Sequence, residues 1–115
     1  MANLIYQHSP ELRARWPKMS LREQMGNIGS EVSRSLRWFG RDDKRFWGAF
    51  ARALELLDMS IDAAVVYDRQ HADSHRTKEL CLAREELCDY FFGGNTWQTD
   101  PVRLQRYYDQ FVPVR

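Results

Sequence analysis

Two histidines are the residues of this chain whose spacing most resembles a metal site. His71 and His75 are four residues apart, which would place both imidazoles on one helix face. Asp68 and Asp73 lie nearby, but no second set of Glu and His recurs on another predicted helix, as a di-metal bundle requires. We therefore interpret both histidines as solvated side chains at the entry of a helix, and we expect no metal.

Paired carboxylates are the second candidate for chemistry. They occur at Glu55 with Asp58 and again in residues 85–89, and an arginine precedes each set, Arg52 and Arg84. General acid–base catalysis needs carboxylates in a pocket that shifts their pKa values, whereas helix-spaced opposite charges form ion pairs. The chain also lacks a phosphate-binding loop and a nucleophile-elbow motif. We expect ion pairs here, no catalytic activity and no cofactor.

Basic residues gather around the predicted turn between the first two long helices. They are Arg34, Arg37, Arg41, Lys44 and Arg45, with Arg52 further along. Trp38, Phe39 and Trp47 lie among them. Arginines neutralise phosphates and aromatic rings stack on bases, so one interpretation is an RNA- or DNA-binding surface. The other, which we favour, is that the rings belong to the core and the charges surround the end of a helical hairpin.

Composition places the chain among single-domain globular proteins. It has 115 residues, of which 43% are hydrophobic, 29% charged and 13% aromatic. The net charge of +1 is uneven, because residues 1–54 carry +5 and residues 55–115 carry −4. This asymmetry could help identical subunits to dock head to tail, or could offer a basic surface to an acidic partner.

Cysteine spacing and hydropathy bear on the compartment. Cys81 and Cys88 would lie roughly 10 Å apart along one helix, which is too far for a disulfide. The first twelve residues have no basic region followed by an apolar run, and no window approaches the ~20 apolar residues of a membrane span. We expect reduced thiols, a cytoplasmic location and no membrane partner.

Apolar periodicity predicts four helices that would position these groups. The first begins at Ser20, which forms a capping box with Glu23, and ends at Gly40. Its apolar stripe is Leu21, Met25, Ile28, Val32, Leu36 and Phe39. Beside the stripe, Gly26, Gly29, Ser30 and Ser33 form a strip of small residues. Such a strip allows another helix to approach closely.

The second predicted helix begins at Asp42 or Asp43 and continues into residues 63–67. Its apolar face covers roughly half the circumference, which suggests burial on two sides. One side would be the core and the other an oligomer or partner interface, for which we select Trp47 and Phe50. Residues 68–72 are polar and predict a loop.

Residues 73–95 form the third predicted helix, with Asp73 or Ser74 as its cap and Gly93-Gly94 as its end. The last helix is capped by Thr99 or Asp100, with Pro101 at its first position. The sequence thus predicts an all-α fold, an antiparallel up-down-up-down four-helix bundle over residues 20–115. Residues 1–19 are expected to be an irregular segment with at most one short turn at residues 11–15. We expect Leu4, Ile5, Tyr6 and Trp16 to dock this segment on the body.

Three sequence blocks resemble a known family. They are NIGSEVSRSL at residues 27–36, RALELLDMSI at 52–61 and KELCLAREELCDYFFGGN at 78–95. Together they are similar to the small bacterial four-helix-bundle proteins related to those encoded in intervening sequences of large-subunit ribosomal RNA. Relatives in that family include accessory subunits of retroelement reverse transcriptases, which form ring-shaped pentamers and bind the transcriptase and nucleic acid.

The resemblance implies a non-enzymatic homo-oligomer, such as a pentameric ring, that acts as an interaction or assembly module with a protein partner. The retroelement accessory proteins are strongly basic, whereas this chain is nearly neutral. RNA or DNA binding through the five basic residues, with a reverse transcriptase as a partner, is therefore the alternative function.

Overall fold

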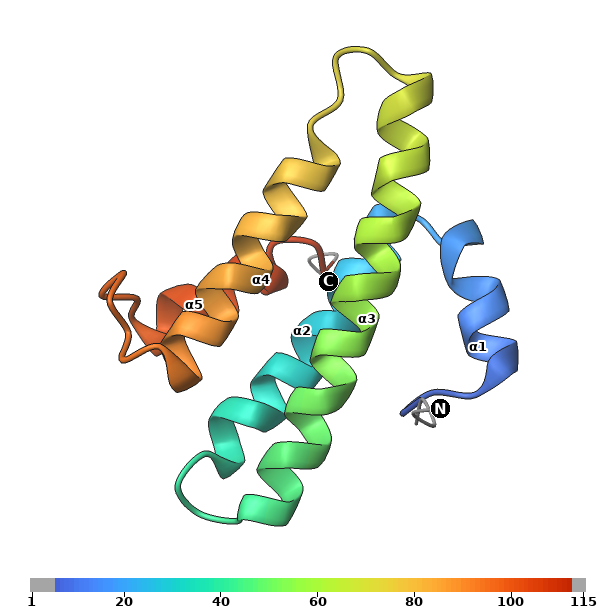
Figure 1. The fold of residues 1–115 in the computed structure, drawn as a ribbon. Helices are drawn as coiled ribbons and strands as arrows, with labels where there is room; N and C mark the ends of the chain where they lie inside the picture. The colour runs from blue at the N-terminus through green and yellow to red at the C-terminus, as the bar shows by residue number, and fades with distance from the viewer. Residues whose placement is uncertain (1–5, 113–115) are drawn as a thin grey trace, which may run out of the picture.

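The computed structural model describes residues 6–112, and within this range the fold is all-α, without a strand (Figure 1). It comprises α1 (Pro10–Arg15), a 3-10 turn (Trp16–Lys18), α2 (Leu21–Trp38), α3 (Asp43–Gln70), α4 (Arg76–Phe92) and α5 (Pro101–Asp109). The prediction that the fold is all-α is confirmed for these residues. Each of the four predicted helices is present, although α5 has only nine residues and α3 has 28.

Helices α2 and α3 form a hairpin whose two caps agree with the sequence. Ser20 Oγ accepts the backbone N–H of Glu23 at 3.1 Å, which is the first bond of the predicted capping box, and the Ser20 hydroxyl also donates to the Glu23 carboxylate. Gly40, with φ of +75°, follows the end of α2. Asp42 then accepts the backbone N–H of Arg45 and caps α3. The four residues 39–42 therefore reverse the chain direction sharply.

The start of α4 differs from the prediction. Neither Asp73 nor Ser74 is its cap, and α3 continues through most of the predicted loop to Gln70. Asp68, in the last turns of α3, accepts hydrogen bonds from the backbone N–H groups of Arg76 and Thr77 and from the Ser74 hydroxyl. These bonds lower the pKa of Asp68 from 3.8 to about 2. A carboxylate of the preceding helix thus stabilises the first turn of α4.

Helix α5 packs against α2, where the strip of small residues lies. Asp100 caps α5 by accepting the backbone N–H of Val102 at 2.7 Å, and Pro101 occupies its first position, both as predicted. A Cβ on Gly29 would stand 2.7 Å from Cβ of Tyr108, so only glycine allows this approach. Gln105 adds a hydrogen bond from its side chain to the carbonyl of Gly29.

The core lies where α2, α3 and α4 meet, and α5 and Trp16 close it. Its fully buried members include Met25, Ile28, Val32, Leu57, Leu87, Leu104 and Tyr108. Trp16 is 1% exposed and donates its indole N–H to Ser60 Oγ at 2.9 Å. Trp16 docks as predicted, whereas Tyr6 is half-exposed, and Leu4 and Ile5 lie outside the described residues. Residues 10–18 are helical rather than irregular, with Ser9 as the cap of α1.

The predicted up-down-up-down order and the antiparallel bundle remain predictions. Helix α3 packs against both α2 and α4, and Figure 1 shows α1 beside the middle of α3 and α5 behind α4. Within residues 6–112, no helix has the length and apolar character needed to span a bilayer.

Candidate functional site

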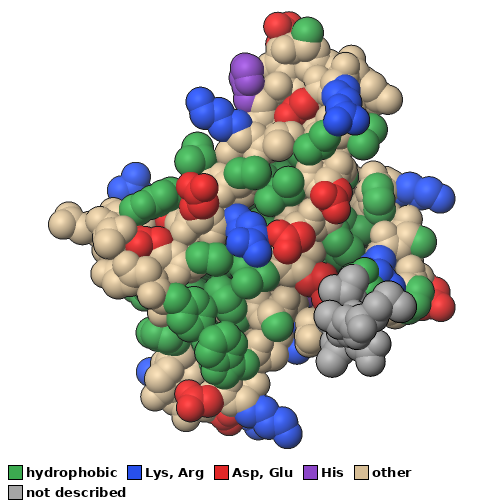
Figure 2. Space-filling model, in the orientation of Figure 1, with side chains coloured by type: hydrophobic (Ala, Val, Ile, Leu, Met, Phe, Trp, Pro, Cys, Tyr) green, Lys and Arg blue, Asp and Glu red, His purple; other side chains and the backbone are tan. Residues whose placement is uncertain are grey.

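Half-exposed aromatic rings gather where the end of α2, the start of α3 and the end of α4 meet. We call this the aromatic surface and define it by Phe39, Trp47 and Phe92, which are 46%, 55% and 51% exposed. Three buried rings support it from below, Phe46, Phe50 and Phe91. Figure 2 shows the resulting apolar patch at the lower left of the molecule. An exposed cluster of large aromatic side chains is typical of an interaction surface.

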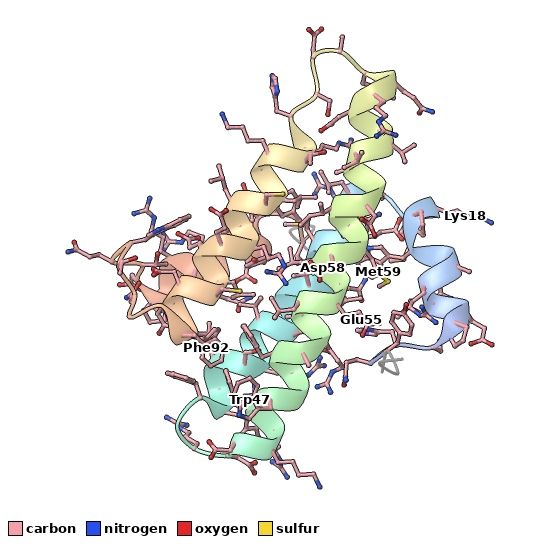
Figure 3. All side chains as sticks on the ribbon, in the orientation of Figure 1. Lys18, Trp47, Glu55, Asp58, Met59 and Phe92 are labelled. Carbon is pink, nitrogen blue, oxygen red and sulfur yellow. The ribbon has the colours of Figure 1, made fainter. Side chains whose placement is uncertain are left out.

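Ring contacts hold the aromatic surface in shape. The rings of Trp47 and Phe92 stack with centroids 5.2 Å apart and an interplanar angle of 17°, and Figure 3 labels this pair at the adjacent ends of α3 and α4. Phe39 packs edge-on against Phe91 at 5.0 Å. Aromatic pairs in these geometries are favourable beyond the area that they bury. The surface is therefore a fixed platform, supplied by three helices.

The two residues that were predicted to form an interface, Trp47 and Phe50, differ in exposure. Trp47 faces outward, but Phe50 is 3% exposed and packs against Phe92 at 5.0 Å, inside the same subunit. Phe39, which the periodicity placed in the core stripe, is half-exposed instead. Sequence analysis did not select Phe92 for the interface, although its position directly before Gly93 marks it as the last residue of a helix, where coverage by neighbours ends.

Beside the aromatic surface, α2 and α3 form a recess of about 600 Å³ that we call the basic recess. It is lined by Arg34, Trp38, Asp42, Lys44, Arg45, Gly48, Ala49 and Arg52. The guanidinium of Arg45 lies over the Trp38 ring at 4.5 Å. The carboxylate of Glu31, which is nearly buried, holds Arg34 at 2.9 Å and Arg52 at 3.1 Å. Glu31 thus fixes two arginines at one edge of the recess.

The structure brings only part of the predicted nucleic-acid set together. Arg34, Lys44 and Arg45 share the basic recess, which also gains Arg52. Arg37 instead lines a smaller hollow between α2 and α5. Arg41 lies in the turn after Gly40 and is exposed. A single ligand in the recess would therefore meet three of the five predicted residues.

A third feature is a groove between α1 and α3, with a volume of about 830 Å³. Leu54, Met59, Ala63 and Val66 of α3 form much of its apolar lining. Figure 3 shows Glu55 and Met59 directed from α3 toward α1. We call this the α1–α3 groove.

The two histidines have different surroundings, and the paired carboxylates form hydrogen bonds and ion pairs. The ring of His71 stacks on Tyr67 at 3.9 Å, and His75 precedes the first turn of α4, so they do not share a helix face. No group of three His, Cys, Asp or Glu side chains within residues 6–112 is arranged to hold a metal ion. Arg84 donates to Asp58 at 2.7 Å, and this hydrogen bond raises the pKa of the guanidinium. Ion pairing was the predicted use of these charges, but Arg84 and Arg52 pair with Asp58 and Glu31 of other helices rather than with the carboxylates that follow them in sequence.

No family model, no curated protein and no solved structure matches this chain. The resemblance of the three sequence blocks to the intervening-sequence family therefore stays a prediction.

Proposed function

We propose that this chain is a non-enzymatic interaction module that assembles with further copies of itself through the aromatic surface. The observation that carries the proposal is the exposure of Phe39, Trp47 and Phe92 in one patch, on a platform of three buried rings. Water contacts about half of each ring in the single subunit, and the hydrophobic effect favours covering such area.

The rigidity of the patch supports the same proposal. Stacking of Trp47 on Phe92 fixes both rings before any partner arrives, so association does not require these side chains to lose much rotamer freedom. Preorganised aromatic residues are the side chains that most often dominate the energy of protein interfaces.

Two finer parts of the proposal, the order of the helices and the ring of subunits, rest on the sequence predictions. We propose that α2–α5 form an antiparallel up-down-up-down bundle, because short links join consecutive helices, α3 packs against both α2 and α4, and α5 packs against α2. We further propose a closed ring of subunits, as the resemblance to the intervening-sequence family implies. A ring forms when one subunit's patch meets a different patch on the next subunit and the rotation closes.

Sedimentation velocity over a range of protein concentrations tests self-association. Trp47→Ser removes a ring with about 55% of its area exposed. For an aromatic side chain this corresponds to about 80–140 Å². At ~25 cal/mol per Å² the loss is at most about 2–3.5 kcal/mol, or roughly 30- to 300-fold in the dissociation constant.

The matched control is Leu82→Ser, because Leu82 is 47% exposed on α4, about 15 Å along the helix from Phe92. We expect Leu82→Ser to associate like the unmodified chain. Equal association by the Trp47→Ser variant would remove the aromatic surface from the proposal.

Nucleic-acid binding is the second candidate function, and the basic recess is the observation that favours it. Arg34, Lys44, Arg45 and Arg52 surround a hollow with an aromatic wall, which suits a phosphate and a stacked base. A gel-shift titration with single-stranded RNA across salt concentrations tests it. Each phosphate contact should lower the log–log slope of affinity against salt by about 0.7, and absence of binding at low salt would dismiss this candidate.

A further inference from the structure

The α1–α3 groove has an acidic wall with an apolar floor. Glu55, Asp58 and Asp62 line it at successive turns of α3, and residues 54–66 contain no lysine or arginine. Arg13 of α1 and Arg84 of α4 also line the groove, and Arg84 is paired with Asp58. Leu54, Met59 and Val66 lie between and beside these carboxylates on the same helix. The α3 wall therefore offers apolar contact together with three negative charges.

The three carboxylates differ in the hydrogen bonds and ion pairs that they form. Glu55 accepts the backbone N–H groups of Gln7 and His8, which ties the segment before α1 to α3. Asp58 has the ion pair with Arg84 but is still 56% exposed at its side chain. Asp62 is exposed and forms no ion pair within the described part of the chain. Asp62 is thus the carboxylate that is available to a partner's cation.

The hairpin tip, which we define as residues 37–47, is basic, whereas the α3 wall of the groove is acidic. The tip contains four basic and two acidic residues, a net charge of +2. Arg41 and Lys44 are exposed and form no ion pair among residues 6–112. Lys44 precedes Trp47 by three residues, so both lie on one side of α3. The tip therefore presents exposed aromatic rings beside free cations, although Asp43 also lies near Trp47.

The tip and the groove match in character but cannot meet within one subunit. Trp47 and Leu54 both belong to the continuous helix α3, so the helix itself keeps the tip away from its own groove. Figure 1 shows the tip at the lower end of the α2–α3 hairpin, whereas α1 borders the groove higher along α3. Two different patches that match each other on the same chain produce a head-to-tail contact between copies.

We infer that the hairpin tip of one subunit docks into the α1–α3 groove of a second copy, with the Trp47 side of the tip on the apolar floor and Lys44 facing Asp62. The groove volume of about 830 Å³ is large enough to admit an indole side chain with its neighbours. This inference rests on the proposed self-association and specifies which second surface takes part. The contact is directional, so each subunit has one donor tip and one acceptor groove.

Mixing two variants tests the directional contact. Trp47→Ser disables the tip and leaves the groove intact, and Asp62→Lys places a cation opposite Lys44 and leaves the tip intact. At a concentration where the unmodified chain is assembled, each variant alone should have the mass of one subunit, 13.7 kDa. An equimolar mixture should contain particles of about twice that mass, because one intact tip then meets one intact groove.

Charge reversal elsewhere supplies the control. Glu85 is exposed on α4, and Glu85→Lys should assemble like the unmodified chain. Assembly by Asp62→Lys at the unmodified level, or a mixture that stays at 13.7 kDa, would overturn the docking of tip into groove while leaving self-association in place. A monomeric unmodified chain would instead overturn the proposed function together with this inference.

Discussion

Gly29 and Gly26 offer a matched pair of substitutions that tests how α5 packs on α2. Both lie in the interior of α2, where alanine is more favourable than glycine by about 0.5–1 kcal/mol. They differ in what the added methyl group meets. At Gly26 the nearest atom is Cγ2 of Val112 at 4.0 Å, an ordinary contact, whereas at Gly29 it is Cβ of Tyr108 at 2.7 Å.

The loss of stability that we expect at Gly29 follows from this distance. Carbon atoms in van der Waals contact prefer about 3.5–4.0 Å, so α5 must move by nearly 1 Å to admit the methyl group. Tyr108 cannot avoid it by rotating, because its Cβ is attached directly to the backbone and its side chain is buried. Overpacking typically costs about 1–3 kcal/mol, which exceeds the gain in helix propensity.

We therefore expect the same substitution, glycine to alanine, to change the free energy of unfolding in opposite directions at the two positions. Gly26→Ala should raise the free energy of unfolding by about 0.5–1 kcal/mol, and Gly29→Ala should lower it by about 1 kcal/mol after the propensity gain is included. Urea unfolding monitored by circular dichroism, at one protein concentration for all samples, measures both. A Gly29→Ala variant as stable as Gly26→Ala would refute the close approach of α5.

Three further predictions concern buried and capping groups. Ser60→Ala should lower the free energy of unfolding by about 1–3 kcal/mol, measured by urea unfolding, because it leaves the buried indole N–H of Trp16 without an acceptor. Asp68→Asn should make the fold less stable than the unmodified chain at pH 7. This difference in stability should shrink as pH falls from 3.8 toward about 2, where the native carboxylate is protonated. Thermal melts that show a pH-independent difference would contradict this. Phe50→Ala should cost about 3–5 kcal/mol in urea unfolding, far more than Trp47→Ser in the isolated subunit, because Phe50 is buried and Trp47 is half-exposed.

Local signals were the ones that sequence analysis interpreted well. Ser20, Asp42 and Asp100 cap their helices as expected, because a cap depends on a few neighbouring residues. Apolar spacing identified the buried stripe of α2, and the small residues beside it indicated the side that α5 approaches. These features need only the periodicity of one helix.

Features that depend on a distant element were missed. His75 precedes α4 without a capping side-chain bond, and the carboxylate that accepts the first N–H groups of α4 belongs to Asp68. Asp68 can reach them only because α3 continues to Gln70. Phe50 and Trp47 occupy one wide apolar face, and the end of α4 decides which of them is covered. The α1–α3 groove likewise depends on the place where Trp16 anchors the N-terminal segment. The apolar periodicity of a single helix does not predict that place.

Light scattering of the unmodified chain after size-exclusion chromatography tests self-association most directly. The account predicts a mass that is a multiple of 13.7 kDa and that falls toward one subunit on dilution or on substitution of Trp47 by serine. A mass of 13.7 kDa at every concentration, with the aromatic surface intact, would contradict it.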